Sequence, residues 1–317
     1  MDQRRLIAGT PELWDDNSAT SSHAPPYALA LINELSVKGL VRDSRLQSRI
    51  VRRIEHLGCL EAARLSLASL TGMNPAKVRW VLGSGFTMTE FLIAPVIGAA
   101  SPPAICSLGA LVNLMVVLCD RLLDAGTPVD DILPSSGRRS PVFDLLDAYR
   151  VEFAAVQPTH SLYALSEKLI ARMIDSERQT VFARDRLPYR HWFRKSAFPI
   201  VLMALAAWTC RECAAHTRSN MTFSRHLRWL CRVGLFFGVL DDAADYERDI
   251  ASAQPNCFRS RSTAEGNRLC RRAASWGTAI LADWSEFAGG SAKAVLFKET
   301  FLNLTWAWLK PAAATPP

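Results

Sequence analysis

The stretch from Phe91 to Cys119 carries no charged residue, and it constrains the fold more than any other segment of the chain. On length alone it could cross a lipid bilayer. However, Ser101-Pro102-Pro103 interrupts it, and the charged residues Glu90 and Asp120 lie at its two ends. Proline ends or kinks a helix, and a helix that is apolar on all sides belongs inside a large protein. We therefore expect two buried central helices joined at the prolines, and no stable membrane span.

The rest of the sequence has the periodicity of α-helices. Apolar residues recur every three or four positions over 27–70, 78–97, 105–123, 142–153, 162–182, 189–213, 224–250 and 268–308. Alternating β-branched runs between hairpin turns do not stand out. We predict a single all-α domain over 27–309, a disordered segment at 1–26 and a tail at 310–317. Because Gly83-Ser84-Gly85 lacks the rest of a phosphate-binding loop, we expect only a helix break there.

Composition limits the classes of partner. The chain has 317 residues, of which 49% are apolar, so it can bury a substantial core. Its net charge of +7 comes more from arginine than from lysine, which suits a nucleic acid, an anionic membrane surface or a diphosphate. Since no compact basic block is interleaved with aromatic residues, we expect no nucleic-acid partner. Scattered cysteines and a polar N-terminal segment favour a reduced, cytoplasmic protein, and peripheral membrane contact stays open.

Two acidic clusters each follow an apolar run of helical periodicity. The first is Asp120-Arg121-Leu122-Leu123-Asp124, and the second extends from Asp241 to Asp249. Positions four apart lie on one face of a helix, so carboxylates in each cluster stack and repel by roughly a few tenths of a kcal/mol per pair. An acidic run is also common on a solvated helix face, and Arg121 could simply pair with Asp124. The prediction that follows depends on the two clusters together.

Hard cations between two facing clusters would remove this repulsion. Mg²⁺ takes oxygen ligands, often one or two carboxylates, and completes its octahedron with water and substrate phosphate. We therefore predict a site for several Mg²⁺ ions and a diphosphate at the mouth of an apolar pocket. The predicted metal ligands are Asp120, Asp124, Asp241, Asp242, Asp245 and Asp249.

The segment from about Val112 to Phe258 resembles the trans-prenyl diphosphate synthases. Gly234 to Asp245, with Asp249 four further on, looks like their second aspartate-rich motif, and Asp120 to Asp124 looks like their first motif with its middle position changed. Tyr189 to Phe198 resembles the segment that carries their Lys-Thr pair. Asp241 to Asp249 also matches the spacing of the second metal motif of class I terpene synthases. The resemblance implies an isoprenoid synthase bundle around a deep apolar cavity, with Mg²⁺ bridging a diphosphate to both motifs.

Departures from the family pattern narrow the expected activity. Arg121 stands where chain-elongating enzymes have an aspartate, and the arginine pair that helps them bind isopentenyl diphosphate is missing, since the next arginine is Arg138. The resemblance thus implies a class I terpene synthase acting on a linear C15 or C20 allylic prenyl diphosphate. The alternatives are a prenyltransferase to a non-isopentenyl acceptor, a chain-elongating prenyl diphosphate synthase and a catalytically dead relative. The family commonly forms dimers, so a homodimer stays open.

Ionisation of an allylic diphosphate needs positive charge at the leaving group and a dry cavity for the carbocation. We expect Lys195 and Arg194, with Arg248, to bind the diphosphate. Trp192 and Phe237 are the candidates for the cavity wall, where an aromatic face stabilises a desolvated cation by about 2 kcal/mol.

Overall fold

A computed structural model describes residues 26–40, 47–65, 72–98, 100–134, 139–156, 158–181, 188–208 and 221–313. Of the segments expected to be disordered or loosely attached, 1–26 and 310–317, residues 1–25 and 314–317 lie outside the described residues. Within the described residues the regular structure is helical throughout, which confirms the all-α prediction. The elements are α1 (Pro26–Val37), α2 (Gln47–Leu65), α3 (Pro75–Ile97), α4 (Pro103–Asp124), α5 (Val129–Ile132), α6 (Pro141–Ala155), α7 (His160–Val181), α8 (Tyr189–Ala204), the 3-10 helix η3 (Leu205–Trp208), α10 (Phe223–Ala244), α11 (Tyr246–Ala251), α12 (Thr263–Ala288) and α13 (Ala292–Ala313).

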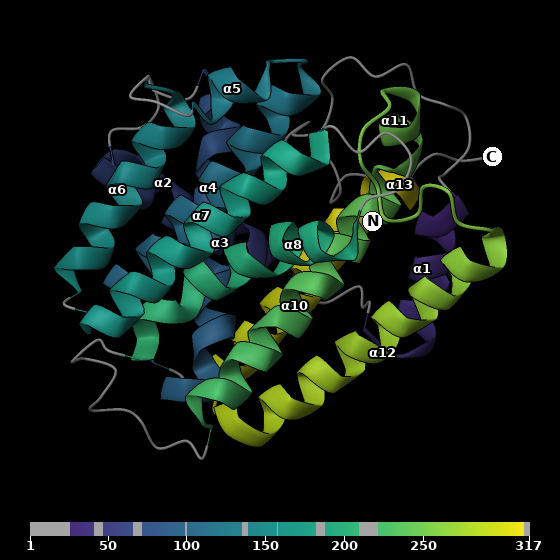
Figure 1. The fold of residues 1–317 in the computed structure, drawn as a ribbon. Coiled ribbons are helices and arrows are strands. Elements are labelled where there is room, and N and C mark those ends of the chain that lie inside the picture. The colour runs from purple at the N-terminus through teal and green to yellow at the C-terminus, as the bar shows by residue number, and fades with distance from the viewer. Residues whose placement is uncertain are drawn as a thin grey trace.

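The uncharged stretch forms the C-terminal part of α3 and most of α4, and these two helices pack side by side at the centre of the bundle (Figure 1). Pro102 is the N-cap of α4 and Pro103 its first residue, so the helices meet at the prolines as predicted. Both helices are long and apolar enough to cross a membrane, and most of the apolar part of each is buried inside the protein. Packing therefore accounts for their composition, and the absence of a membrane span stays a prediction.

The predicted helix break at Gly83-Ser84-Gly85 is wrong, because α3 continues through it. A Cβ added to Gly83 would lie 1.9 Å from the carbonyl oxygen of Ile54 on α2. One added to Gly85 would lie 2.6 Å from the Cβ of Asn113 on α4. The two glycines are therefore needed for close helix packing, a use that the sequence alone does not distinguish from a break.

Three predicted helical runs are divided in the structure. The run 27–70 separates into α1 and α2 near Gly39, whose φ is +65°, and the run 268–308 separates into α12 and α13 at Gly289, whose φ is +75°. The run 224–250 breaks at Asp245, which has φ −97° and ψ 5° between α10 and α11. Helices on both sides of each break face the same core, so the apolar periodicity continues across it. At the C-terminus, α13 reaches Ala313 and so includes the first residues of the expected tail.

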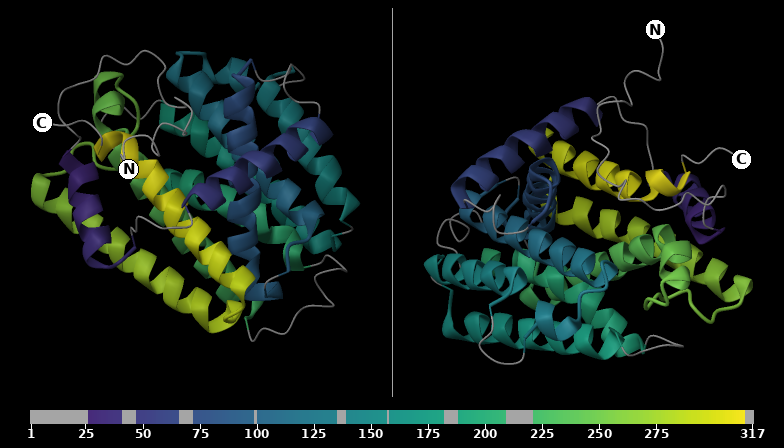
Figure 2. Two further views of the ribbon diagram at one scale, coloured as in Figure 1. Left: turned by 180° about the vertical axis from the view of Figure 1, so that it is seen from behind. Right: turned by 90° about the horizontal axis from the view of Figure 1, so that it is seen from above.

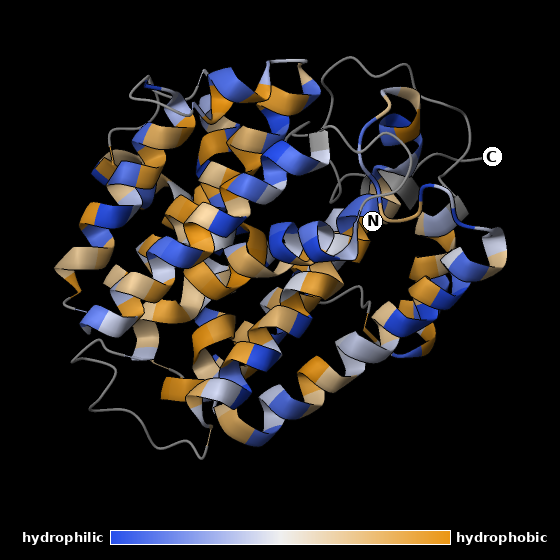
Figure 3. Ribbon diagram, in the orientation of Figure 1, coloured by the Kyte–Doolittle hydropathy of each residue, from blue (hydrophilic) through white to orange (hydrophobic). Residues whose placement is uncertain are grey.

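The helices are arranged around α3, α4 and α10. Seen from behind and from above (Figure 2), α2 and α13 cover one face of the bundle and α7 lies on the opposite face. α10 packs between α8 and α12, and α1 packs on α12. Hydrophilic and hydrophobic bands follow one another along outer helices such as α12 (Figure 3), as expected for helices with one solvated face. This arrangement brings the C-terminal ends of α4 and α10 together.

Candidate active site

A cavity of about 830 Å³ lies inside the bundle. Its wall is formed by α2, α3, α4, α6, α7, α8, α10, α11 and α13. Most of the side chains that line it are apolar, including Met88, Met115, Ile200 and Leu304. Carboxylates from the C-terminal ends of α4 and α10, and from the residue that follows α10, also line it: Asp120, Asp124, Asp241, Asp242 and Asp245. The structure thus brings the two predicted acidic clusters to one cavity.

Close packing of α8 against α10 positions this end of the cavity. A Cβ added to Gly234 would lie 2.4 Å from the carbonyl oxygen of Ser196, and one added to Gly238 would lie 2.3 Å from its hydroxyl oxygen. Both additions are too close for a real side chain, so the two glycines let the helices approach along this line. As a result Lys195 of α8 faces the same cavity as Asp241 of α10.

Arg248 of α11 joins the two acidic clusters. Its Nη2 lies 3.2 Å from Oδ2 of Asp124 and 2.9 Å from Oδ2 of Asp245. Its Nε lies 3.8 Å from Oδ1 of Asp249. Gln254 adds a second link across the gap, because its Nε2 donates to Oδ1 of Asp124 at 2.7 Å. The guanidinium of Arg248, which the sequence predicts to bind the diphosphate, therefore lies among three carboxylates.

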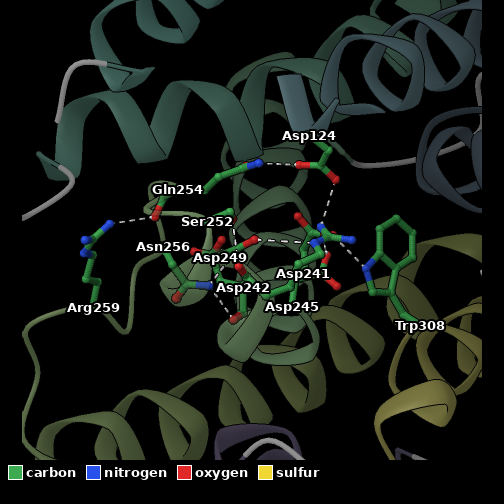
Figure 4. A network of polar contacts seen from close by, with 11 residues as sticks. Asp124, Asp241, Asp242, Asp245, Asp249, Ser252, Gln254, Asn256, Arg259 and Trp308 are labelled. Carbon is green, nitrogen blue, oxygen red and sulfur yellow. Dashed lines mark hydrogen bonds and ion pairs between the residues drawn. The ribbon is translucent and has the colours of Figure 1, made fainter. Parts of the chain in front are cut away.

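Asp242 and Asp249 are held by their own chain (Figure 4). Oδ2 of Asp242 accepts hydrogen bonds from Nε1 of Trp192 and from the backbone N–H of Cys257, each at 2.9 Å. Nδ2 of Asn256 donates to Oδ2 of Asp249 at 2.8 Å and to the carbonyl oxygen of Asp242 at 2.7 Å. Asp249 is buried and does not line the cavity. The break at the end of α10 turns it away, so the predicted shared face of one continuous helix does not extend to this residue.

Burial and mutual repulsion raise the pKa values of the cavity carboxylates. The pKa of Asp120 rises to about 7 through burial, then through the charges of Asp241 and Asp124. Burial also raises the pKa of Asp245 to about 7, although the Arg248 guanidinium opposes the shift. The pKa of Asp241 lies well above its usual range for the same reasons, burial first. Carboxylates that retain protons near neutral pH would be stabilised by a bound cation, which is the charge pattern of a functional site.

Lys195 places a positive charge on the cavity wall. Its Nζ lies 2.9 Å from Oε2 of Glu177 on α7, which also lines the cavity. Burial alone would lower the pKa of Lys195, but the charges of Glu177, Asp120 and Asp242 outweigh it and raise that pKa above its usual value. The side chain is therefore an ammonium group at neutral pH.

The structure does not bring Arg194 to the cavity. Its Nη1 lies 3.5 Å from Oδ2 of Asp175 on α7, and Arg194 is not among the residues of the cavity wall. Neighbouring residues on a helix point about 100° apart, so Lys195 faces the cavity and Arg194 does not. Arg121 does line the cavity, whereas Arg138 lies outside the described residues.

Aromatic side chains border the acidic end of the cavity. Phe237 lines the cavity, and its ring centroid lies 5.6 Å from that of Trp308, another wall residue. Nε1 of Trp308 donates to Oδ1 of Asp241 at 3.0 Å, so its indole lies beside the carboxylates (Figure 4). Trp192 also lines the cavity. Both predicted aromatic residues are thus wall residues.

Four residues of this site were not among the site residues predicted from the sequence: Glu177, Gln254, Asn256 and Trp308. Gln254 and Asn256 belong to a Gln-Pro-Asn turn directly after the second acidic cluster. A polar turn in that position is a local signal that could have identified them. Glu177 and Trp308 come from α7 and α13, distant in sequence, and no local pattern indicates their role.

The donor set suits Mg²⁺ with added ligands better than a closed protein cage. Within the described residues, no three side chains of His, Cys, Asp or Glu are grouped so as to hold an ion by themselves. Mg²⁺ usually takes one or two carboxylates and fills its other positions with water and phosphate. Asp120, Asp124, Asp241 and Asp245 offer such carboxylates from two sides of the cavity. They therefore fit an ion that is completed by water and by a substrate.

Comparison with known proteins adds no relative: no family model matches the chain, and neither does any curated protein or solved structure. The all-helical fold is established by the structure alone.

Proposed function

We propose that this chain is a Mg²⁺-dependent class I terpene synthase of the isoprenoid synthase fold. It would ionise a linear allylic prenyl diphosphate of C15 or C20, cyclise or rearrange the carbocation, and release diphosphate. One observation carries the proposal: carboxylates from the ends of α4 and α10 face each other across Arg248 at a largely apolar cavity of about 830 Å³. That volume lies within the usual range for a small-molecule site.

The chemistry follows from charge. Breaking the allylic C–O bond leaves both bonding electrons on the diphosphate and a cation on the prenyl chain. When bound, Mg²⁺ supplies Lewis-acid neutralisation of the leaving group. Asp120, Asp124, Asp241 and Asp245 would hold the metal, and the Lys195 ammonium adds a fixed positive charge to the wall. Released diphosphate can accept the final proton, so the reaction needs no separate protein base.

The apolar wall would protect the carbocation. A single water molecule would quench it, so the cavity must exclude water during the reaction. Phe237 and Trp308 border the acidic end, where ionisation would start, and present aromatic groups to the cavity. An aromatic face in a desolvated site stabilises a cation by about 2 kcal/mol.

A prenyltransferase is the second candidate function. The observation that favours it is the polar part of the wall contributed by Gln47 of α2 and Lys77 of α3. A pocket for a hydrocarbon chain alone does not need these groups, whereas an acceptor with polar groups could use them. The two candidates differ in one requirement, because a cyclising enzyme needs no acceptor.

The test is incubation of the purified chain with Mg²⁺ and geranyl, farnesyl or geranylgeranyl diphosphate, without an acceptor. Diphosphate release and organic-extractable products are measured together. We expect a new hydrocarbon or alcohol from one substrate and none in EDTA. A parallel reaction with added isopentenyl diphosphate detects chain elongation, and one with candidate acceptors detects prenyl transfer. If none of these reactions releases diphosphate, the proposed activity on these substrates is wrong, and the interpretation as a catalytically dead relative gains support.

A matched pair of variants ties activity to the site. Asp241→Asn should abolish diphosphate release while the circular dichroism spectrum stays that of a folded helical protein. Asp147→Asn is the control, because Asp147 is 67% exposed in its side chain and pairs only at the surface with Arg150. Full activity in Asp241→Asn would remove this carboxylate from the proposed metal site.

A further inference from the structure

A second cavity, of about 560 Å³, lies beside the candidate active site. Trp192 lines both cavities. The residues around the second cavity are Tyr189, Trp192, Asn256, Cys257, Arg259, Arg261, Glu265, Arg268, Leu269, Arg272 and Trp276. Because four of them are arginines, we call it the arginine pocket.

Local structure places the four arginines around one space. Arg268, Arg272 and Trp276 follow one another at intervals of four on α12 and therefore lie on one face of the helix. Arg259 and Arg261 come from the turn before α12, on either side of a serine at position 260 whose φ is +61°. A non-glycine residue in this left-handed region is uncommon.

The arginines of this pocket form no ion pair with the part of the chain that the structure describes. Within the described residues, no carboxylate oxygen lies within the 4.0 Å ion-pair distance of any of the four guanidinium groups. Arg259 donates from Nη1 to the carbonyl oxygen of Gln254 at 3.1 Å, and Arg261 donates from Nε to that of Cys257 at 2.5 Å. These two bonds to neutral carbonyl groups hold the side chains in place and do not neutralise their charge.

Among the described residues, Glu265 is the only carboxylate on the pocket wall, and it is already hydrogen-bonded. Glu265 accepts hydrogen bonds from the backbone N–H and the hydroxyl of Ser262 in the capping box of α12. Those bonds, the backbone one first, lower the pKa of Glu265, so it is ionised at neutral pH. Among the described wall residues, four guanidinium groups and one carboxylate leave an excess of positive charge. Guanidinium groups match phosphate oxygens in geometry.

Aromatic rings add a flat, apolar part to the pocket. The guanidinium carbon of Arg272 lies 5.3 Å from the ring centroid of Trp276. Tyr189 is 66% exposed and contributes a second ring from the start of α8. Such a wall suits a ligand that carries a phosphate group next to a planar or apolar group.

We propose that the arginine pocket binds a small phosphate-bearing ligand, separately from the cavity of the proposed function. The two sites share a wall that holds Asp242, since Trp192 and Cys257 both donate to its carboxylate. The proposal does not depend on the function of the first cavity, because the charges and the wall of the arginine pocket come mainly from α12 and the turn before that helix.

The test is isothermal titration calorimetry of the full chain with inorganic diphosphate at physiological salt concentration. EDTA is present so that no metal ion can bind diphosphate at the acidic clusters. We expect one binding site. The double variant Arg268→Gln/Arg272→Gln should weaken binding at least tenfold. Arg271→Gln is the matched control, because Arg271 is an exposed neighbour on the same helix and does not line the pocket. The targeted arginines are also exposed, so the variants should fold, which circular dichroism checks.

Three outcomes would overturn the proposal. Absence of binding to the unmodified chain is the first. An equal loss in Arg271→Gln is the second, because it would show attraction to net charge rather than to a pocket. The third is loss of binding in Lys195→Gln with retention in the double variant, which would place the diphosphate in the first cavity.

Two further measurements test the ligand chemistry. Trp276→Leu should weaken binding of phenyl phosphate and leave binding of diphosphate unchanged, since only the ring contact is removed. Cosedimentation with vesicles tests the competing source of phosphate, using phosphatidylcholine with and without phosphatidic acid. Binding to the anionic vesicles through the same arginines, without binding of the free ligands, would contradict a small-molecule pocket. In Asp241→Asn we expect diphosphate binding to persist, so failure of the proposed catalysis remains distinguishable from failure of this site.

Discussion

Replacing Asp249 by asparagine should stabilise the metal-free protein at pH 8 and change its stability little at pH 4. Asp249 is only 7% exposed, and its Oδ2 accepts a hydrogen bond from Nδ2 of Asn256 at 2.8 Å. Asparagine retains a carbonyl oxygen that can accept this bond. The substitution therefore removes the charge and keeps the main contact.

The magnitude follows from the pKa of the carboxyl group, which burial raises from 3.8 to about 7 in the folded protein, against the opposing hydrogen bond from Asn256. In the unfolded chain the group loses its proton near pH 4, and in the folded protein only near pH 7. Its contribution to stability is therefore present below pH 4 and lost as the pH rises to 7. A shift of this size corresponds to about 4 kcal/mol. Asparagine should recover up to that amount at pH 8.

The assay is urea denaturation in EDTA at pH 4, 6 and 8, with Asp147→Asn as a control for the loss of an exposed carboxylate. The free energy of unfolding of Asp249→Asn, relative to the unmodified protein, should increase with pH and reach a plateau above pH 7. An Asp249→Asn protein no more stable than the parent at pH 8 would refute the reasoning. So would a stability difference that is the same at all three pH values.

Three further predictions concern the core. Burial lowers the pKa of His226 to about 4, so acidification should remove about 2 kcal/mol of stability between pH 7 and pH 5, and His226→Gln should lack this loss in urea denaturation. Gly234→Ala should push α8 away from α10, lower the free energy of unfolding by about 1–3 kcal/mol and reduce diphosphate release. Gly290→Ala should have none of these effects, because an added Cβ there meets nothing within 4 Å. Unchanged stability of Gly234→Ala would contradict the packing argument. Arg53→Met should cost about 3–5 kcal/mol, because it leaves Glu90 buried without its partner at 2.5 Å, and adding Glu90→Gln should recover part of that loss; a double variant no more stable than Arg53→Met would contradict this.

The sequence predicted the helices well because their apolar periodicity reports which face is buried. It predicted helix ends poorly where packing decides them. Gly83 lies inside a helix because α2 approaches it, and Asp245 ends α10 although the acidic pattern continues through it. Neither fact is encoded in local propensity alone.

The same limit applies to the candidate site. Asp120 and Asp241 were predicted to face each other, and both line one cavity. The prediction for Asp249 assumed one continuous helix, and the break at the end of α10 moves it behind the wall. Arg248 was expected to bind diphosphate, which stays a prediction, and its contacts with carboxylates of both clusters were not predicted. A contact between segments so far apart in sequence depends on the tertiary fold, which a single sequence does not give.

The position of Arg248 allows the acidic site to fold without a bound metal ion. In small metal-dependent domains, metal binding supplies the free energy of folding. Here a cation that belongs to the chain already bridges Asp124 and Asp245, so the two acidic helices can come together before any ion arrives. Under the proposed function, an incoming divalent ion is a competitor that displaces a resident guanidinium. The displaced Arg248 would then be available to bind the diphosphate that enters with the metal. Metal binding and the release of Arg248 from the carboxylates would therefore occur together.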